Sequence, residues 1–270
     1  MNVFARFTHC LIKQGLLYGS FLMVFMLSLE PLEASPAHEK DSAHKETLRV
    51  GCEIDYPPYC FQNDEGEAAG FSVELFRAVA LEMGFEVEFK MGPWNTLKYD
   101  LVKGKLDALP VVARTQEREK LYEFSTAYQK MHGTIVVRKE EQGIQSLRDL
   151  EGREVAVMKG DHAEEFLRGS QLDANLIQRT TFKRALIELS QGQHDAVVMQ
   201  RLTAIQLMNE QSITNLKLVG NPTGIFNQSL CFAVEEGNNE LQGLLNEGLS
   251  IVKAYGTYRR LHAKWFAPIE

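Results

Sequence analysis

The chain has 270 residues, of which 44% are apolar and 24% charged, an ordinary composition for a globular protein of one or two domains. Its formal net charge is −7. Because binding to nucleic acid requires a basic face that neutralises phosphates, we expect no nucleic-acid partner.

The first 34 residues have the order of a secretory signal peptide. Two basic residues come first, the stretch 15–29 is apolar, and small residues follow it. We expect cleavage after Ala34 or Ala37, a polar leader over 35–46, and a periplasmic protein. An apolar run of about 15 residues is short for a membrane span, so an uncleaved membrane anchor is the less favoured alternative.

Three cysteines follow this segment, Cys52, Cys60 and Cys231. Cys52 and Cys60 are close enough in sequence to form a disulfide in an oxidising compartment. A buried free thiol at Cys52 is equally consistent with its apolar surroundings in the sequence. The cysteines and histidines lack the spacing of a metal site, so we expect neither metal nor cofactor.

The first half of the chain predicts a β-α-β-α-β series. A strand over Leu48–Cys52 must leave its sheet at Pro57-Pro58, because proline cannot continue a strand ladder. Apolar periodicity and stop signals then indicate alternating elements. They are a helix over Phe71–Met83, a strand over Phe85–Phe89, a helix over Trp94–Val102 and a strand from Ala108.

A second β-α-β-α-β series begins at Glu154. Its expected elements are strands over Glu154–Met158, Leu176–Gln178 and Ala196–Met199, and helices over Ala163–Arg168 and Phe182–Ser190. Strands over Gly133–Arg138 and Ser229–Glu235 would cross between the two series. Helices over Leu202–Met208, Asn239–Ala254 and Tyr258–Trp265 complete the prediction. The expected lobes are therefore 47–135 with 226–270, and 136–225.

One short pattern ends both series: Leu, two residues, Gly, two residues, then Asp-Ala and an apolar run. The copies run from Leu101 to Asp107 and from Leu189 to Asp195 at the same offset. The pattern indicates a helix stopped by glycine, a turn and a buried strand. Asp at such a turn favours local hydrogen bonds, so we expect Asp107 and Asp195 to be structural.

The motifs in their order resemble those of the extracytoplasmic solute-binding proteins of family 3, which include periplasmic receptors for polar amino acids. They are LRVGCEIDYPPYCF, GFSVELFRAVALEMG, GKLDALPVVARTQEREKLYEFSTAY, LEGREVAVMKGDHAEEFL, HDAVV and GTYRRLHAKWF, spread over about residues 47–267. The resemblance implies an α/β fold of the periplasmic-binding-protein-like type II, with two lobes joined by two crossing strands around a ligand cleft. It also implies a small carboxylate or amino acid as ligand, a membrane permease as partner and a monomeric state.

The resemblance also implies binding residues in the first lobe. Arg118 matches the arginine that holds the ligand α-carboxylate, in keeping with the planar fork of a guanidinium; the alternative is a surface arginine paired with Glu117 or Glu119. Tyr56 and Trp94 match an aromatic wall against the ligand side chain, although Trp94 is also a candidate for core packing.

Other positions depart from the family pattern. Val111 and Ala113 stand where typical receptors carry hydroxyl side chains, so only backbone groups remain to bind a ligand there. Asp161 and His162 stand at the start of a helix, where free N–H groups favour a ligand carboxylate. For Asp161, capping of that helix is the favoured alternative.

Gln200 is the most informative departure, because receptors place at its position an Asp that pairs with the ligand ammonium. The retained Arg118 and the missing acid predict a ligand with a carboxylate but no α-ammonium. Alternatively, Glu53 or Asp55 supplies the acid from the first lobe.

Three functions are compatible with these residues. The favoured one is a solute-binding protein that serves an ABC-type transporter. The second is a ligand-sensing module for a membrane sensor. The third is a periplasmic dehydratase of cyclic carboxylates, which needs a positioned proton carrier such as Glu53, Asp55 or His162. None of these has an evident partner, so we expect no enzymatic activity.

Overall fold

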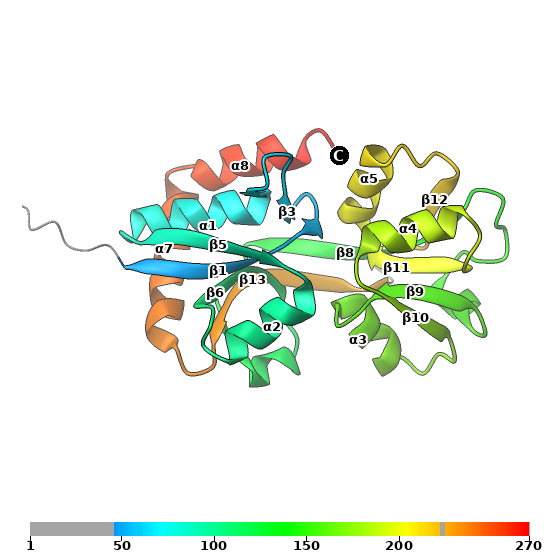
Figure 1. Cartoon of the computed structure of the whole chain (residues 1–270), viewed down its shortest axis with the longest axis horizontal. Coiled ribbons are helices and arrows are strands. Elements are labelled where there is room, and N and C mark those ends of the chain that lie inside the picture. The colour runs from blue at the N-terminus through cyan, green and yellow to red at the C-terminus, as the bar shows by residue number, and fades with distance from the viewer. Residues whose placement is uncertain (1–45, 222–224, 270) are drawn as a thin grey trace, which may run out of the picture. The chain divides into compact units, whose positions relative to one another are not determined.

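The computed structural model describes residues 46–221 and 225–269. The predicted signal peptide and nearly all of the leader lie outside these residues. None of the helices within the described part has the length and apolar character needed to cross a membrane. The described residues form two α/β lobes joined by two strands (Figure 1).

Among the described residues, ten strands join in one sheet that runs through both lobes. Lobe 1 contributes β1 (Thr47–Glu53), β5 (Glu86–Gly92), β6 (Ala108–Ala113) and β7 (Tyr122–Phe124), and lobe 2 contributes β9 (Glu154–Met158), β10 (Asn175–Arg179), β11 (Ala196–Gln200) and β12 (Leu216–Val219). The crossing strands are β8 (Gln129–Arg138) and β13 (Asn227–Glu235).

The two lobes repeat one topology. In lobe 1 the order β5-β1-β6 is parallel and β13 lies antiparallel to β6. In lobe 2 the order β10-β9-β11 is parallel and β8 lies antiparallel to β11. The first part of β8 pairs with β13, and its second part pairs with β11 and β12. Both crossing strands therefore belong to both lobes, whereas the exact lobe boundaries stay a prediction.

Asp107 and Asp195, the aspartates of the repeated pattern, fix the turn before the third strand in each lobe. Asp107 accepts a hydrogen bond from the backbone N–H of Arg49 in β1 at 2.7 Å. Asp195 accepts one from the backbone N–H of Glu154 in β9 at 3.0 Å. Each Asp thus joins the turn before the third strand to the first strand of its own lobe. The predicted structural role of both residues is confirmed.

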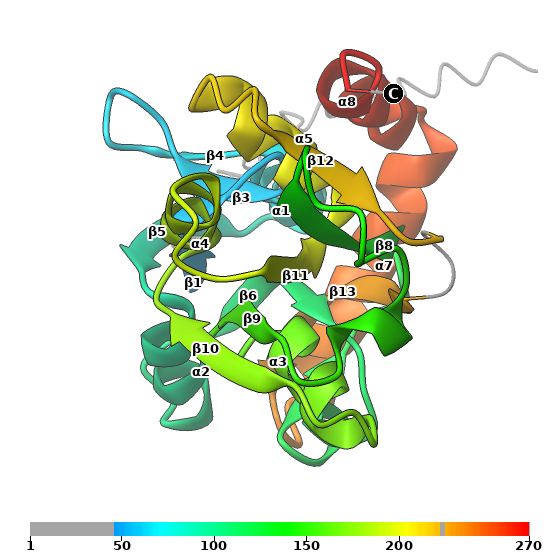
Figure 2. The same cartoon turned by 90° about the vertical axis from the view of Figure 1, so that its right-hand side faces the viewer.

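Helices cover both faces of the lobe-2 strands, with α3 (His162–Gly169) on one side and α4 (Phe182–Ser190) and α5 (Arg201–Glu210) on the other (Figures 1 and 2). In lobe 1, α1 (Phe71–Glu82) packs against α7 (Asn239–Ala254) and α8 (Thr257–Phe266), and α2 (Trp94–Val102) packs against β1 and β6. All predicted helices are present, with ends that differ by at most two residues.

Strand β6 is buried along its whole length, as expected for a central strand with a continuous apolar run. It contains Pro110, which has no N–H for a ladder bond. The β6–β13 register shifts between Cys231 and Ala233, opposite Pro110 and Val111. The irregular pairing therefore falls where the proline removes a donor.

The chain leaves the main sheet after Glu53, at the end of β1, and therefore ahead of the Pro57-Pro58 segment at which we predicted the departure. The sequence did not predict that this segment forms a second small sheet of β2 (Asp55–Tyr56), β3 (Cys60–Gln62) and β4 (Ala68–Ala69). A disulfide between Cys52 of β1 and Cys60 of β3 links the main sheet to the small sheet, with Cα atoms 5.9 Å apart. Cys52 is therefore disulfide-bonded and not a free thiol, which the sequence had left open. Cys231 is a buried free thiol.

Candidate ligand-binding site

A small cavity lies between the lobes, where the carboxyl ends of parallel strands face each other, the usual place for a ligand in such sheets. Its volume is about 20 Å³. Six of the eight predicted site residues line it, together with three others. The lining residues are Glu53, Tyr56, Trp94, Val111, Ala113, Arg118, Met131, Asp161 and Leu230.

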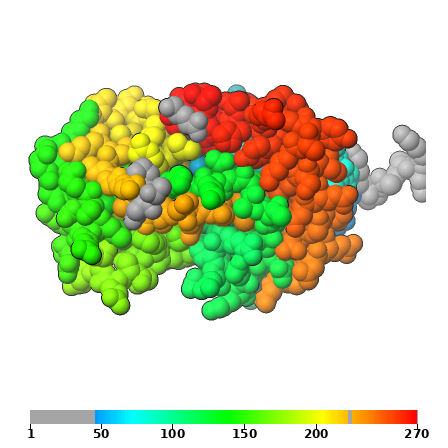
Figure 3. Space-filling model, turned by 180° about the vertical axis from the view of Figure 1, so that it is seen from behind, coloured from blue at the N-terminus to red at the C-terminus, as the bar shows by residue number. Residues whose placement is uncertain are grey.

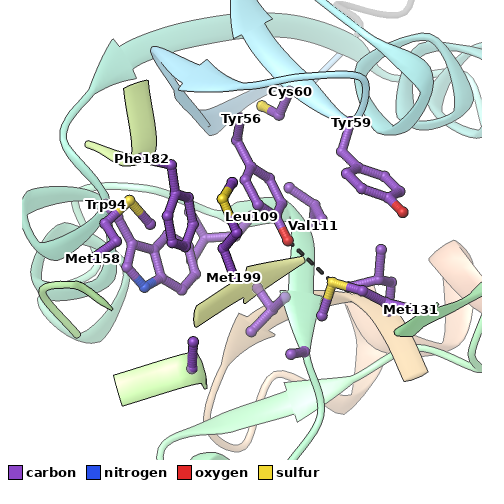
Figure 4. Packing of buried hydrophobic residues seen from close by; sticks show 14 of the residues in the cluster. Tyr56, Tyr59, Cys60, Trp94, Leu109, Val111, Met131, Met158, Phe182 and Met199 are labelled. Atoms are coloured by element: carbon purple, nitrogen blue, oxygen red, sulfur yellow. Dashed lines mark hydrogen bonds between the residues drawn. The ribbon is translucent and has the colours of Figure 1, made fainter. Parts of the chain in front are cut away.

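Tyr56 and Trp94 form the predicted aromatic wall of this cavity. The Tyr56 hydroxyl points to the sulfur of Met131, 3.1 Å away, on the crossing strand β8 (Figure 4). The Trp94 Nε1–H donates to the carbonyl of Gly160 in lobe 2 at 2.9 Å. Trp94 is only 8% exposed, so it contributes to the core and also faces the cavity.

Arg118 reaches the cavity from the short helical turn Arg118–Lys120 that follows β6. It is 4% exposed, so it is not the surface arginine of the alternative interpretation. Its Nη1 donates to the carbonyl of Ala113 at 3.2 Å, and its Nη2 contacts Glu165 of α3 at 3.0 Å. The Thr115 hydroxyl accepts a hydrogen bond from the Arg118 backbone N–H at 3.2 Å. Thr115 therefore satisfies the first N–H of this turn, whose N-cap residue is Glu117.

The carbonyl of Gly160 is the point where lobe 1 contacts the loop before α3. It accepts hydrogen bonds from Trp94, from Lys98 Nζ at 2.7 Å and from Arg118 Nη2 at 3.5 Å. Gly160 has φ +70°, and a Cβ atom there would lie within 2.6 Å of Lys98 Nζ and collide with Asn95. Glycine is thus required both by the backbone conformation and by the close approach of the lobes.

Asp161 and Gln200 form a buried pair on the lobe-2 side. The Gln200 Nε2 donates to the Asp161 carboxylate oxygens at 2.9 and 3.2 Å. Asp161 also accepts from the Ala163 backbone N–H at 2.8 Å, which confirms that it caps α3. Asp161 lines the cavity, whereas Gln200 lies behind it. Gln200 is therefore not part of the cavity wall, because its amide is turned to Asp161, and its predicted role in ligand binding stays a prediction.

Glu53 lies in the cavity wall at the carboxyl end of β1. Burial, and then the negative charges of Asp161 and Asp55, raise the pKa of its carboxyl well above the usual range, against the opposing effect of Lys98. Asp55 does not line the cavity. It accepts a hydrogen bond from Thr181 and faces Lys183 at the start of α4. Of the two alternative acids, the structure places only Glu53 at the cavity.

His162 was predicted to line the same site, but its side chain lies outside the cavity. It borders a second groove between α3 and the Arg114–Glu117 segment, visible as a hollow in Figure 3. Its Nδ1 is 2.9 Å from the Gln228 amide, and its ring packs edge-on against Phe226. The first residue of α3 therefore turns away from the cavity, and only the cap, Asp161, faces inward.

Val111 and Ala113 line the cavity as apolar wall. The carbonyl of Ala113 accepts a hydrogen bond from Arg118. The backbone acceptor expected at this position is thus used within the protein. Its effect is to fix the guanidinium beside the cavity.

Residues 48–268 match the family model of the bacterial extracellular solute-binding proteins, family 3. The chain belongs to this family. The match covers both lobes and both crossing strands, so the predicted family and fold class are confirmed.

Relatives of this family-3 protein include binding proteins and a sensor domain. The L-cystine-binding protein TcyJ of Escherichia coli K12 is 31% identical over 222 residues, which is 82% of each chain. An ancestral arginine-binding protein bound to arginine is 33% identical, with TM-score 0.77 over 82% of this chain and 99% of its own. A histidine kinase sensor domain similar to periplasmic binding proteins is 32% identical, with TM-score 0.79 over 82% and 96%.

The site of this family-3 protein contains two charged residues, Glu165 and Lys98, that sequence reasoning did not single out. Glu165 and Lys98 lie on helices, and from the sequence alone each is expected to be an ordinary charged residue that faces solvent. Their partners, Arg118 and the Gly160 carbonyl, lie in the opposite lobe. The sequence signal at this point was the Gly160-Asp161 pair, because a Gly directly before a helix cap marks a turn.

Proposed function

We propose that the protein is a periplasmic solute-binding protein that captures an α-amino acid between its lobes and delivers it to an ABC-type transporter. Family membership supports binding, and the named cystine- and arginine-binding relatives support the ligand class. One observation carries the proposal: Arg118 from lobe 1 and Asp161 from lobe 2 face the same cavity. These opposite charges complement the carboxylate and the ammonium of an amino acid.

This proposal changes the ligand expected from the sequence. Gln200 favoured a ligand without an α-ammonium, because the family acid is missing there. In the structure, Gln200 holds the carboxylate of Asp161, which lines the cavity. We therefore assign the ammonium to Asp161 and the carboxylate to Arg118, with Tyr56 and Trp94 against the ligand side chain.

Binding requires a conformational change. The cavity of about 20 Å³ has roughly the space of one water molecule. An amino acid is larger, so the lobes must separate to admit it and then close on it. A ligand that contacts both lobes shifts the equilibrium toward the closed form.

Calorimetry and thermal shift with the twenty amino acids and L-cystine test this function. We expect at least one tight ligand, and we expect Arg118→Ala to weaken its affinity by about 100-fold, because a charged, hydrogen-bonded contact is lost. No binding across the panel would overturn the proposal. Turnover of a cyclic carboxylate by the purified protein would overturn the assignment as a binding protein rather than an enzyme.

The similarity to the histidine kinase sensor domain favours a second candidate, a sensory role. Both roles use the same closed, liganded form and differ in the membrane partner. Deletion of the gene separates them. Loss of amino-acid uptake supports transport, and normal uptake with loss of a transcriptional response to the ligand supports sensing.

A further inference from the structure

The guanidinium of Arg118 already holds a carboxylate from the opposite lobe. Glu165 Oε1 accepts from Nη2 at 3.0 Å and from Nε at 3.3 Å. The other edge of the guanidinium faces two carbonyls, that of Ala113 at 3.2 Å from Nη1 and that of Gly160 at 3.5 Å from Nη2. Both edges with parallel N–H groups are therefore engaged by the protein itself.

A carboxylate binds a guanidinium best through one such edge, with two parallel hydrogen bonds. The Nε/Nη2 edge is available to a ligand only when Glu165 leaves it. A ligand that binds Arg118 in this way exchanges one carboxylate for another, so the net gain from the charge pair is smaller than it would be at an arginine without a partner. Selection among ligands then depends on their remaining contacts.

Glu165 is placed to make this exchange. Its side chain is 38% exposed, whereas that of Arg118 is 5% exposed. It borders the groove between α3 and the Arg114–Glu117 segment, a space of about 780 Å³ into which its side chain can turn (Figure 3). Burial opposes its ionisation, but His162, Arg118 and Lys98 outweigh it and hold the pKa of its carboxyl below the usual value. Glu165 is thus a charged carboxylate at neutral pH.

We propose that Glu165 is an internal competitor for the carboxylate subsite of Arg118 and a latch between the lobes. When no ligand carboxylate is present, the pair holds the closed form. When one arrives, Glu165 must be displaced into the groove. The competitor role rests on the proposed function, whereas the latch role does not.

The pair does not act alone at this interface. Trp94 and Lys98 also donate to the Gly160 carbonyl across the lobes. The removal of the Glu165 charge therefore leaves the hydrogen bonds to the Gly160 carbonyl, the contact of Asp55 with Thr181 and both lobe cores unchanged. We expect Glu165→Gln to fold normally.

The test compares the wild type with Glu165→Gln and with Glu117→Gln, which removes an exposed charge from the same groove without a contact to Arg118. Calorimetry uses L-cystine and L-arginine as probes. If Glu165 competes, its removal destabilises the free protein and not the complex, so Glu165→Gln should bind the better probe about tenfold more tightly. Glu117→Gln should bind as the wild type does.

Equal or weaker binding by Glu165→Gln, when the wild type binds a probe, overturns the competitor role and leaves the proposed function intact. Failure of all variants to bind any member of the amino-acid panel overturns both. Small-angle scattering without ligand tests the latch separately. We expect a larger radius of gyration for Glu165→Gln than for Glu117→Gln, and equal values overturn the latch.

Discussion

The Gln200 amide donates to both carboxylate oxygens of Asp161, at 2.9 and 3.2 Å, in a pair that is almost fully buried. The arrangement holds an acid at the lobe-2 side of the cavity although the strand end itself carries only an amide. Because the amide is neutral, Gln200 holds the Asp161 carboxylate at the cavity without adding a positive charge of its own.

Asp161→Asn should weaken the binding of an α-amino acid by about 10- to 100-fold, since a charged hydrogen bond to the ammonium becomes a neutral one. Calorimetry with the tightest ligand of the panel measures the change. Asp64→Asn is the control, because Asp64 is an exposed turn residue that does not line the cavity. Unchanged affinity in Asp161→Asn would mean that the ammonium lies elsewhere, with Glu53 as the next candidate.

Glu53→Gln should make the folded protein more stable at pH 7. Burial and the nearby Asp161 and Asp55 raise the pKa of Glu53 in the folded state. The folded state thus holds the Glu53 proton more tightly than the unfolded state does. Below the usual pKa of Glu, the Glu53 carboxyl is protonated in both the folded and the unfolded state. As the pH rises from the usual pKa toward the raised pKa of the folded state, the free energy of unfolding decreases.

The expected gain for Glu53→Gln is therefore about 1 kcal/mol or more in the free energy of unfolding at pH 7, with little gain near pH 4. Urea unfolding at both pH values measures it. Glu67→Gln, an exposed change in the same lobe, should have no such pH-dependent effect. A loss of stability at pH 7 would show that the Glu53 charge is well compensated, and the prediction would be wrong.

Asp107→Ala and Asp195→Ala should both destabilise the fold without a change in ligand affinity. Each residue accepts the backbone N–H of the first strand in its lobe. Asp107 also receives two hydrogen bonds from the Arg49 side chain, so its loss should be the larger, at about 1–3 kcal/mol. Urea unfolding and calorimetry measure the two quantities. A drop in affinity at unchanged stability would give these acids the functional role that we exclude.

The sequence was sufficient for the elements within one lobe, because local periodicity and stop signals define them. The helix Trp94–Val102 and the strand Glu154–Met158 begin and end where predicted. Arg118 and Asp161 were found because their positions match family motifs. The sequence could not predict the contacts between the lobes, because residues far apart in the chain meet there. Glu165 and Arg118 are one example, and the hydrogen bond from Lys98 to the Gly160 carbonyl is another.

Gly160→Ala should impair closure of the lobes and so weaken ligand binding. Two effects add in this variant: alanine is strained at φ +70°, and its Cβ would meet Asn95 and Lys98 of the opposite lobe.

Gly152→Ala is the control that isolates the backbone strain from the clash between the lobes. Gly152 has φ +71°, and a Cβ atom added there would meet no other atom within 4 Å. We expect similar losses of stability in the two variants, of about 1 kcal/mol. Only Gly160→Ala should bind ligand more weakly, by about tenfold, since only its methyl group lies between the lobes. Calorimetry measures the ligand affinity of Gly160→Ala and Gly152→Ala, and thermal unfolding measures their stability. Equal affinities in the two variants would show that the closed form tolerates the methyl group.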